Sequence, residues 1–163
     1  MLDLSKFQAT GLETVFHGRH ISPQIYAGLD GQNWSLKDYE ARGGYAALRK
    51  VLGKDGGEGM TPDQVIAEVK ASALRGRGGA GFPAGLKFEF CRNVANETKF
   101  IICNADEGDS GTFADRILME GDPFTIIEGM AIAALAVGAT KGFIYIRSEY
   151  PAAIKQMRKA IEI

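Results

Sequence analysis

Lys99-Phe-Ile-Ile-Cys103 decides the fold, together with Gly142-Phe-Ile-Tyr-Ile-Arg147 further along the chain. Short, continuous apolar runs are typical of strands that lie in a parallel sheet and are buried on both faces. Between the two runs, Asp122-Pro123 predicts an N-cap followed by the first helical residue, and apolar residues from Phe124 onward keep helical spacing up to Gly138. Strand, helix and strand in this order predict a βαβ unit, and therefore an α/β fold with parallel strands.

Further helices are predicted on both sides of this unit. Thr61-Pro-Asp-Gln64 combines a capping Thr, a Pro at the first helical position and a Gln three residues past the cap, so a helix should start at Pro62. Its apolar stripe consists of Val65, Ile66, Val69 and Ala73. Another helix should open at Pro151 and still run at Ile163. Because two strands cannot bury both faces of a sheet, we expect the domain to be incomplete in this chain and to be completed either by further sequence or by a partner subunit.

The first sixty residues are predicted to form a separate arm that ends in a linker. Residues 1–60 contain one persuasive helix, from Trp34 to Leu52, followed by the polar glycine-rich stretch Gly53–Gly59. His17 and His20 have no nearby Cys or acidic cluster, which predicts surface positions rather than metal ligands. The α/β domain is expected over residues 61–163.

Composition excludes several classes of function. The chain has 163 residues, 45% of them hydrophobic, with 19 Lys and Arg against 20 Asp and Glu, which excludes a nucleic-acid-binding tail and a disordered chain. Met1–Thr10 has no apolar stretch long enough for a secretory signal, so a cytoplasmic location is expected. The longest apolar run, Ile126–Ala139, is shorter than the roughly 18 residues that a membrane crossing needs. Cys91 and Cys103 match no metal-ligand spacing and are expected to be reduced thiols.

A basic, glycine-rich loop is the densest feature of the sequence. Residues 74–87 read LRGRGGAGFPAGLK, and Gly76, Gly78 and Gly81 satisfy G-x-G-x-x-G, but a predicted helix stands where the Rossmann fingerprint needs a strand. The span from Val69 to Phe88 has no acidic residue and four basic ones: Lys70, Arg75, Arg77 and Lys87. Exposed amides beside cations suit a phosphate or pyrophosphate, and the alternative is a tight loop that happens to be basic.

An acidic loop follows the first predicted strand. It reads Asn104-Ala-Asp-Glu-Gly-Asp-Ser-Gly111, and residues 104–128 contain seven acidic residues and one basic one. Ligands of open parallel sheets bind beyond the carboxyl ends of the strands, where carboxylates can accept hydrogen bonds from ribose or ring N–H groups and repel a further ribose phosphate. The alternative is a solvated turn that caps the next helix, a role that suits Asp115 or Asp122 better than Asp106 or Glu107. Together, the two loops suit the two ends of one nucleotide.

Phe82, Phe88 and Phe90 flank the glycine-rich loop, where they can either stack on a nucleotide ring or belong to the core. No Ser-His-Asp or Cys-His arrangement is recognisable, so covalent hydrolysis has no support.

Both loops, together with Gly121-Asp-Pro-Phe124 and Tyr145-Ile-Arg-Ser-Glu-Tyr-Pro151, resemble the flavoprotein subunit of NADH dehydrogenases. This family includes the NADH-oxidising subunit of respiratory complex I and the diaphorase subunits of soluble NAD-linked hydrogenases and formate dehydrogenases. The resemblance extends from Thr61 to Pro151 and is fainter over Ser35–Leu48. It implies FMN in a Rossmann-like domain, hydride transfer from NADH, and electron transfer to the iron-sulfur clusters of a thioredoxin-like partner subunit within a larger redox complex.

The resemblance also implies a role for individual residues. Those that would hold the phosphate region of FMN are Gly76, Arg77, Gly78, Gly79 and Lys87, and those that would line the flavin are Asn104, Asp106 and Glu107. Phe82 and Phe90 would face the adenine of NADH, and Asp109 would stand near its nicotinamide. Glu107 and Asp109 would be the catalytic carboxylates, which tune the ring and orient the nucleotide.

The sequence departs from the family in three respects. Asp109-Ser110 stands where complex I members usually have Glu-Pro, and Phe88 where they often have Trp, so the chain looks more like the formate dehydrogenase branch. The family's further acidic flavin loop and the cysteine ligands of its [4Fe–4S] cluster are absent from this chain. The alternative function is therefore a truncated nucleotide-binding or assembly module without redox activity, and a second is an anion-binding protein without a nucleotide.

Overall fold

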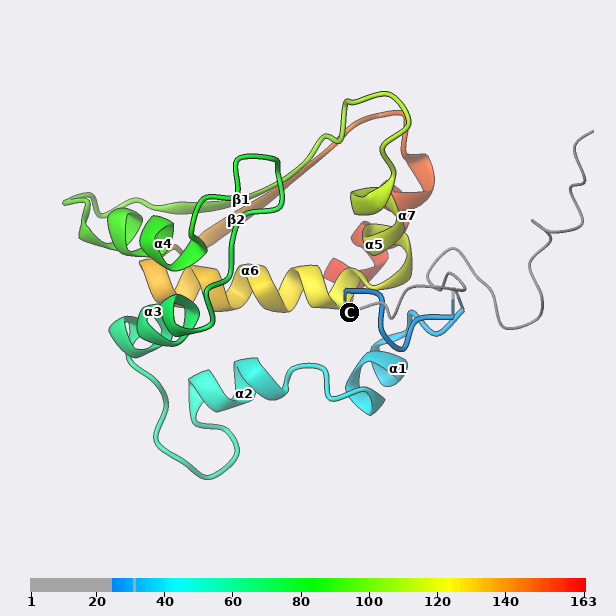
Figure 1. The fold of residues 1–163 in the computed structure, drawn as a ribbon. Helices are drawn as coiled ribbons and strands as arrows, with labels where there is room; N and C mark the ends of the chain where they lie inside the picture. Colours follow the sequence, from blue (N-terminus) through cyan, green and yellow to red (C-terminus); the bar gives the residue numbers. More distant parts are fainter. Residues whose placement is uncertain (1–24, 31) are drawn as a thin grey trace, which may run out of the picture.

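The computed structural model describes residues 25–30 and 32–163, so the chain start, His17 and His20 lie outside the described residues. The elements are α1 (Leu36–Ala41), α2 (Ala46–Leu52), α3 (Pro62–Ala71), α4 (Ala84–Asn93), β1 (Phe100–Ala105), α5 (Ala114–Gly121), α6 (Pro123–Val137), β2 (Lys141–Ile146) and α7 (Pro151–Glu162) (Figure 1). Helices and parallel strands share one layered body, which confirms the predicted α/β class.

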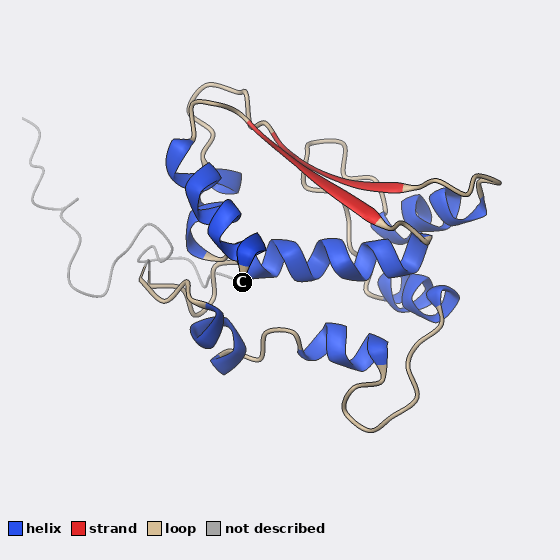
Figure 2. Ribbon diagram, turned by 180° about the vertical axis from the view of Figure 1, so that it is seen from behind, coloured by secondary structure: helices blue, strands red, loops and turns tan. Residues whose placement is uncertain are grey.

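β1 and β2 form a parallel two-stranded sheet. Phe100 pairs with Lys141, and the register continues to Ala105 beside Ile146. The predicted parallel pairing is therefore confirmed, but the connection between the strands contains α5 as well as α6, and α5 was not predicted. The long helix α6 lies along one face of the sheet (Figure 2).

The opposite face of the sheet is open, so the prediction of strands buried on both faces is wrong. Side chains alternate along β1 and β2, and Ile102 and Tyr145 on the open face are 67% and 61% exposed. Phe100 and Phe143 lie edge to face on the same side, with ring centroids 5.6 Å apart. A continuous apolar run does not reveal how many of its faces are covered, because that depends on packing layers elsewhere in the chain.

α6 is the centre of the fold and contacts every other helix and both strands. Phe124 at its start and Val137 at its end are both buried, because the helix is apolar on nearly all sides. The predicted start at Pro123 is confirmed, and so is the end at Gly138, whose φ of +80° suits glycine. Asp122, however, makes no capping bond to the helix backbone; its carboxylate accepts hydrogen bonds from Thr125 and Arg42 at 2.6 and 3.2 Å.

Two other predicted helices are confirmed with small corrections. α3 begins at Pro62 with the predicted capping box, in which Thr61 and Gln64 exchange hydrogen bonds. Val65 and Ile66 are buried as expected, but Ala73 lies beyond the end of the helix, is exposed and has a φ of +55°. α7 begins at Pro151, as predicted.

The single helix predicted from Trp34 to Leu52 is wrong, since a turn separates α1 from α2. Gly43 has a φ of +88°, and a Cβ at Gly44 would overlap the ring of Tyr39. The N-terminus of α2 has no side-chain cap of its own. The buried carboxylate of Glu128 on α6 supplies one, since it accepts hydrogen bonds from the backbone N–H of Tyr45 at 2.8 Å and of Leu48 at 2.9 Å.

Gly85 lets α3 and α4 approach each other closely. A Cβ at this position would lie 2.6 Å from Cγ and 2.8 Å from the backbone nitrogen of Lys70. We expect Gly85→Ala to lower the free energy of unfolding by about 1–3 kcal/mol, because backbone atoms must shift to make room. The measurement is denaturant unfolding followed by circular dichroism.

The matched control is Gly129→Ala on α6, where a Cβ would meet no atom within 4 Å. There the change should stabilise the helix by up to about 1 kcal/mol, because alanine is the better helix former. Equal effects at the two glycines would contradict the close packing of α3 on α4.

Candidate functional site

The glycine-rich loop, residues 74–83, connects α3 to α4 and is closed at its base. The backbone N–H of Gly76 donates to the carbonyl of Phe82 at 2.8 Å, and that of Ala84 donates to Leu74 at 2.9 Å. Inside the loop, the Arg75 guanidinium donates to the Gly81 carbonyl at 2.9 Å. The loop is therefore held by its own hydrogen bonds, and a helix precedes it, as the sequence predicted.

The tip of the glycine-rich loop is open backbone. A Cβ added at Gly78, Gly79 or Gly81 would meet nothing within 4 Å. Gly79 and Gly81 have φ values of +107° and +62°, conformations that a side chain disfavours. The three positions therefore leave room for a ligand to approach the main chain closely.

The four basic residues predicted to surround this loop fall into two groups. Lys70 pairs with Glu89 at 2.6 Å, and Arg75 is occupied within the loop. The side chains of Arg77 and Lys87 are exposed and form no hydrogen bond or ion pair with any residue that the structure describes. Lys87 lies in the first turn of α4, which has no carboxylate and whose N–H groups carry partial positive charge. The cationic contribution to an anion site therefore comes from Arg77, Lys87 and this helix start.

The aromatic residues beside the loop differ in their exposure to solvent. Phe82 and Phe90 are 46% and 58% exposed, with ring centroids 6.3 Å apart. Phe88 packs instead against the cluster of Val51, Val65 and Ile66, so it belongs to the core. Among these three described aromatic residues, Phe82 and Phe90 are therefore available to stack on a ligand, and Phe88 is not.

The acidic loop begins at Asn104, near the carboxyl end of β1 and beside the carboxyl end of β2, and the connection continues to Phe113 before α5 (Figure 1). The Glu107 carboxylate accepts hydrogen bonds from the backbone N–H of Asp115 at 2.7 Å and of Arg116 at 3.0 Å, so it caps α5. The expectation that Asp115 or Asp122 would suit such a cap better than Glu107 is wrong. Glu107 lies eight residues before the Asp115 N–H that it caps, so no local capping motif in the sequence could reveal this contact.

The other predicted residues of the acidic loop are placed differently. The side-chain oxygen of Asn104 accepts a hydrogen bond from the backbone N–H of Asp106 at 3.3 Å, and this bond stiffens the start of the loop. Asp109 is exposed in the middle of the loop, and its backbone carbonyl accepts a hydrogen bond from the N–H of Thr112 at 3.2 Å. Burial and the neighbouring Glu107 carboxylate raise the pKa of Asp115. The carboxylates of Glu107 and Asp115 therefore influence each other at this end of the sheet.

Arg147 and Tyr150 anchor the acidic loop, a role that the sequence did not reveal. The Arg147 guanidinium donates to the Glu107 carbonyl at 2.9 Å, and the Tyr150 hydroxyl donates to the Thr112 carbonyl at 3.2 Å. Burial raises the pKa of Tyr150, as does the Glu107 carboxylate, so the hydroxyl remains a donor at neutral pH. The glycine-rich and acidic loops share no hydrogen bond or ion pair among the described residues; each is tied to its own surroundings.

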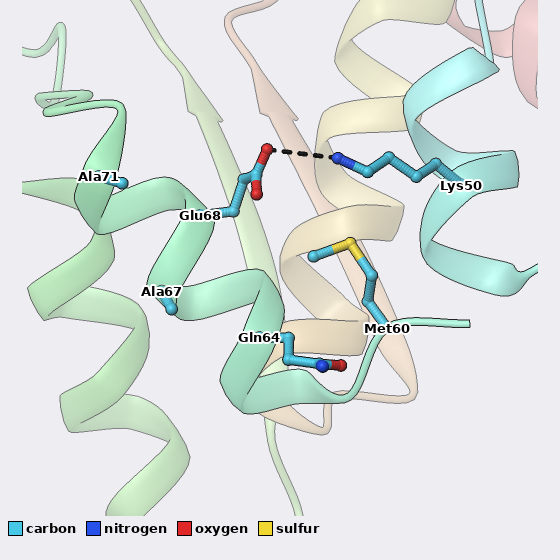
Figure 3. Close-up of a pocket in the computed structure, with 6 residues that line it drawn as sticks. All are labelled: Lys50, Met60, Gln64, Ala67, Glu68 and Ala71. Carbon is cyan, nitrogen blue, oxygen red and sulfur yellow. Dashed lines mark hydrogen bonds and ion pairs between the residues drawn. The ribbon is translucent and has the colours of Figure 1, made fainter. Parts of the chain in front are cut away.

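Two hollows lie outside the acidic loop. One of about 310 Å³ adjoins the base of the glycine-rich loop, between Val69, Leu74, Pro83 and Leu86. The other, of about 490 Å³, lies between α2 and α3 and is spanned by the Lys50–Glu68 ion pair (Figure 3). Neither hollow is lined by a predicted site residue.

Within residues 25–30 and 32–163, no group of three His, Cys, Asp or Glu side chains can hold a metal ion. Every helix in that part of the chain is too short or too polar to cross a membrane. Cys91 and Cys103 are free thiols, as expected.

Residues 69–163, which contain both loops, match the family described as the Nuo51 FMN-binding domain. The chain belongs to this family. The match covers the glycine-rich loop, the βαβ unit and α7, so the family assignment and the site residues fall on the same segment.

Relatives in this family are redox subunits. The chain is 54% identical over 126 residues to an NADH-quinone oxidoreductase subunit of Rhizobium meliloti, covering 77% of this chain and 29% of the relative. It is 51% identical over 128 residues to the HndC subunit of the NADP-reducing hydrogenase of Solidesulfovibrio fructosivorans, covering 78% of this chain and 25% of that one. It therefore spans less than a third of the length of these relatives.

A solved structure shows the same fold. A chain of an NAD+-reducing [NiFe]-hydrogenase in the air-oxidised state matches with a TM-score of 0.60 and 48% sequence identity, covering 62% of this chain and 18% of that chain.

Proposed function

We propose that this chain is the part of an NADH-oxidising, or NAD-reducing, flavoprotein subunit that holds FMN and receives NADH. The observation that carries the proposal is the open tip of the glycine-rich loop beside two unpaired cations, Arg77 and Lys87, within a segment that matches an FMN-binding family. These residues fit a phosphate, because bare amides, cations and a helix start all favour an anion there.

In this proposal, FMN held at this site would supply the redox chemistry: it would accept a hydride, two electrons and one proton, from NADH and release the electrons singly to iron-sulfur clusters. Gly78 and Gly79 offer N–H groups to the phosphate, whereas the N–H of Gly76 is already bonded to the Phe82 carbonyl and shapes the base of the loop. Arg77 and Lys87 neutralise its charge. Holding the two rings in contact is the main contribution of the protein, because orientation alone removes a large part of such a barrier.

The acidic loop provides the other end of the proposed site. Asn104 and Asp106 line the flavin, and Glu107 contributes a fixed carboxylate whose position is set by its two bonds to α5. Asp109, exposed in the middle of the loop, orients the nicotinamide end of NADH. The exposed rings of Phe82 and Phe90 stack on the adenine.

The partners follow from the same proposal. Relatives named as hydrogenase and quinone oxidoreductase subunits support a place in a larger redox complex. We propose that the electrons leave to an iron-sulfur subunit of the thioredoxin-like type. The [4Fe–4S] cluster expected in the family has no cysteine ligands in this chain, whose two cysteines are Cys91 and Cys103.

The test is colour. The purified protein with FMN bound should be yellow and should bleach under anaerobic conditions when one equivalent of NADH is added, because hydride transfer removes the absorbance of the oxidised flavin. A colourless protein that binds NADH without oxidising it would instead be a nucleotide-binding module. A protein that responds to phosphate but not to NADH would be an anion-binding protein.

A further inference from the structure

The acidic loop is fastened at two points by residues that follow β2. At its start, the Glu107 carbonyl accepts a hydrogen bond from Arg147 at 2.9 Å. At its end, the Thr112 carbonyl accepts one from the Tyr150 hydroxyl at 3.2 Å. Both donors come from the segment between β2 and α7, about forty residues further along the chain. The loop therefore depends on this second segment for its backbone path.

The two anchors are themselves held in place. Arg147 also donates to Glu149 at 3.3 Å, and its guanidinium lies 5.5 Å from the centre of the Tyr150 ring. The Arg116 guanidinium lies 5.6 Å from the centre of the same ring. Two cations pack on the Tyr150 ring, and its hydroxyl interacts with both the Thr112 carbonyl and the Glu107 carboxylate.

Between the anchors, the loop has little support of its own. Gly108 and Gly111 add flexibility, and the backbone bond that closes this stretch runs from the Thr112 N–H to the Asp109 carbonyl at 3.2 Å. Glu107 adopts a left-handed backbone, with a φ of +46°. Such a conformation at a non-glycine residue persists only where its surroundings impose it, and here the surroundings are α5 on the carboxylate and Arg147 on the carbonyl.

We infer that Arg147 and Tyr150 are positioning residues, which hold the acidic loop so that Glu107 and Asp109 meet the flavin and the nicotinamide. This inference rests on the proposed function for the roles of the two carboxylates. The anchoring itself rests on the two hydrogen bonds to backbone carbonyls.

The first experiment measures the loop without any ligand. Hydrogen exchange of the purified protein should show faster exchange of the amides of residues 108–112 in Arg147→Met and in Tyr150→Phe than in the parent. Tyr150→Phe keeps the ring and loses only the hydroxyl, so it tests the anchor even where Arg147→Met folds poorly. Unchanged exchange in Tyr150→Phe would overturn the inference, whatever the protein does with NADH.

The second experiment separates positioning from a general loss of structure. In the FMN-loaded protein, kcat/KM for NADH per bound flavin should fall about ten-fold in Arg147→Met and about three-fold in Tyr150→Phe, because small displacements of an orienting group are costly. Arg147→Lys, which retains a cationic donor, should restore part of the loss. A purely structural role would lower flavin content and Tm while leaving kcat/KM per flavin unchanged, and this result would contradict the inference.

One matched variant serves as a control. Arg158→Met removes an exposed arginine of α7 whose side chain has no hydrogen-bonding or ionic partner in the described part of the chain. It should behave as the parent in exchange and in kinetics. If the parent is not bleached by NADH but the anchor variants still loosen the loop, the proposed function fails and the anchoring stands.

Discussion

Replacing Lys87 by alanine is expected to reduce the affinity of the protein for FMN by about 10- to 100-fold, because a hydrogen bond between a cation and a phosphate contributes roughly 1.5–3 kcal/mol. Lys87 lies in the first turn of α4, directly after the glycine-rich loop, and has no carboxylate partner among the residues described. Its loss therefore removes charge from the phosphate end without disturbing a structural contact.

Hydride transfer in whatever flavin remains should be nearly unchanged. The groups proposed to line the ring lie in the acidic loop, which shares no hydrogen bond with the glycine-rich loop within residues 25–30 and 32–163. The measurement is flavin absorbance per protein after gel filtration, followed by single-turnover bleaching with NADH. A variant that retains as much flavin as the parent would contradict the assigned role of Lys87.

Lys70→Ala and Lys155→Ala are the matched controls. Lys70 belongs to the same basic segment, but its ammonium is already paired with Glu89 at 2.6 Å. Lys155 is an exposed lysine on α7. Both variants should retain FMN almost as well as the parent, so a loss confined to Lys87→Ala would identify a specific phosphate contact rather than a change in net charge.

This contrast between two lysines shows what the sequence could predict of the site. Composition indicated a cationic glycine-rich segment, and the structure bears out its open backbone at Gly78 and Gly79. The sequence could not separate Lys70 from Lys87, because the pairing with Glu89 depends on how α3 packs against α4. Arg147 and Tyr150 escaped notice for the same reason, since hydrogen bonds to backbone carbonyls about forty residues away carry no local signal.

The fold, too, has features that the sequence could predict and features that it could not. Helix ends at Pro62, Pro123 and Gly138 were predictable, because proline and glycine act through local backbone geometry. The open face of the sheet was foreseeable only from the small number of predicted strands, since the apolar run around Ile102 is the same whether or not another layer covers it. The break between α1 and α2 left a local signal in Gly43-Gly44, because glycine is a poor helix former, whereas the contact of Glu128 with the start of α2 left none.

Glu128→Ala is expected to lower the free energy of unfolding by about 3–5 kcal/mol, because three donors in the interior lose their acceptor at once. These donors are the Tyr39 hydroxyl and the backbone N–H groups of Tyr45 and Leu48. Glu128 is 7% exposed, so water cannot readily replace the carboxylate. Since the residue sits on α6, which contacts every other element, the loss should affect the whole domain rather than α2 alone.

Glu128→Gln should cost less, about 1–2 kcal/mol, because its carbonyl oxygen still accepts one or two of the three hydrogen bonds. Glu162→Ala, at the exposed end of α7, controls for the loss of a negative charge and should change stability by less than about 0.5 kcal/mol. For a chain of this size, the alanine variant corresponds to a fall in Tm of about 6–20 °C in a thermal melt. Equal melting temperatures for Glu128→Ala and Glu162→Ala would mean that the buried carboxylate does not join α1 and α2 to α6.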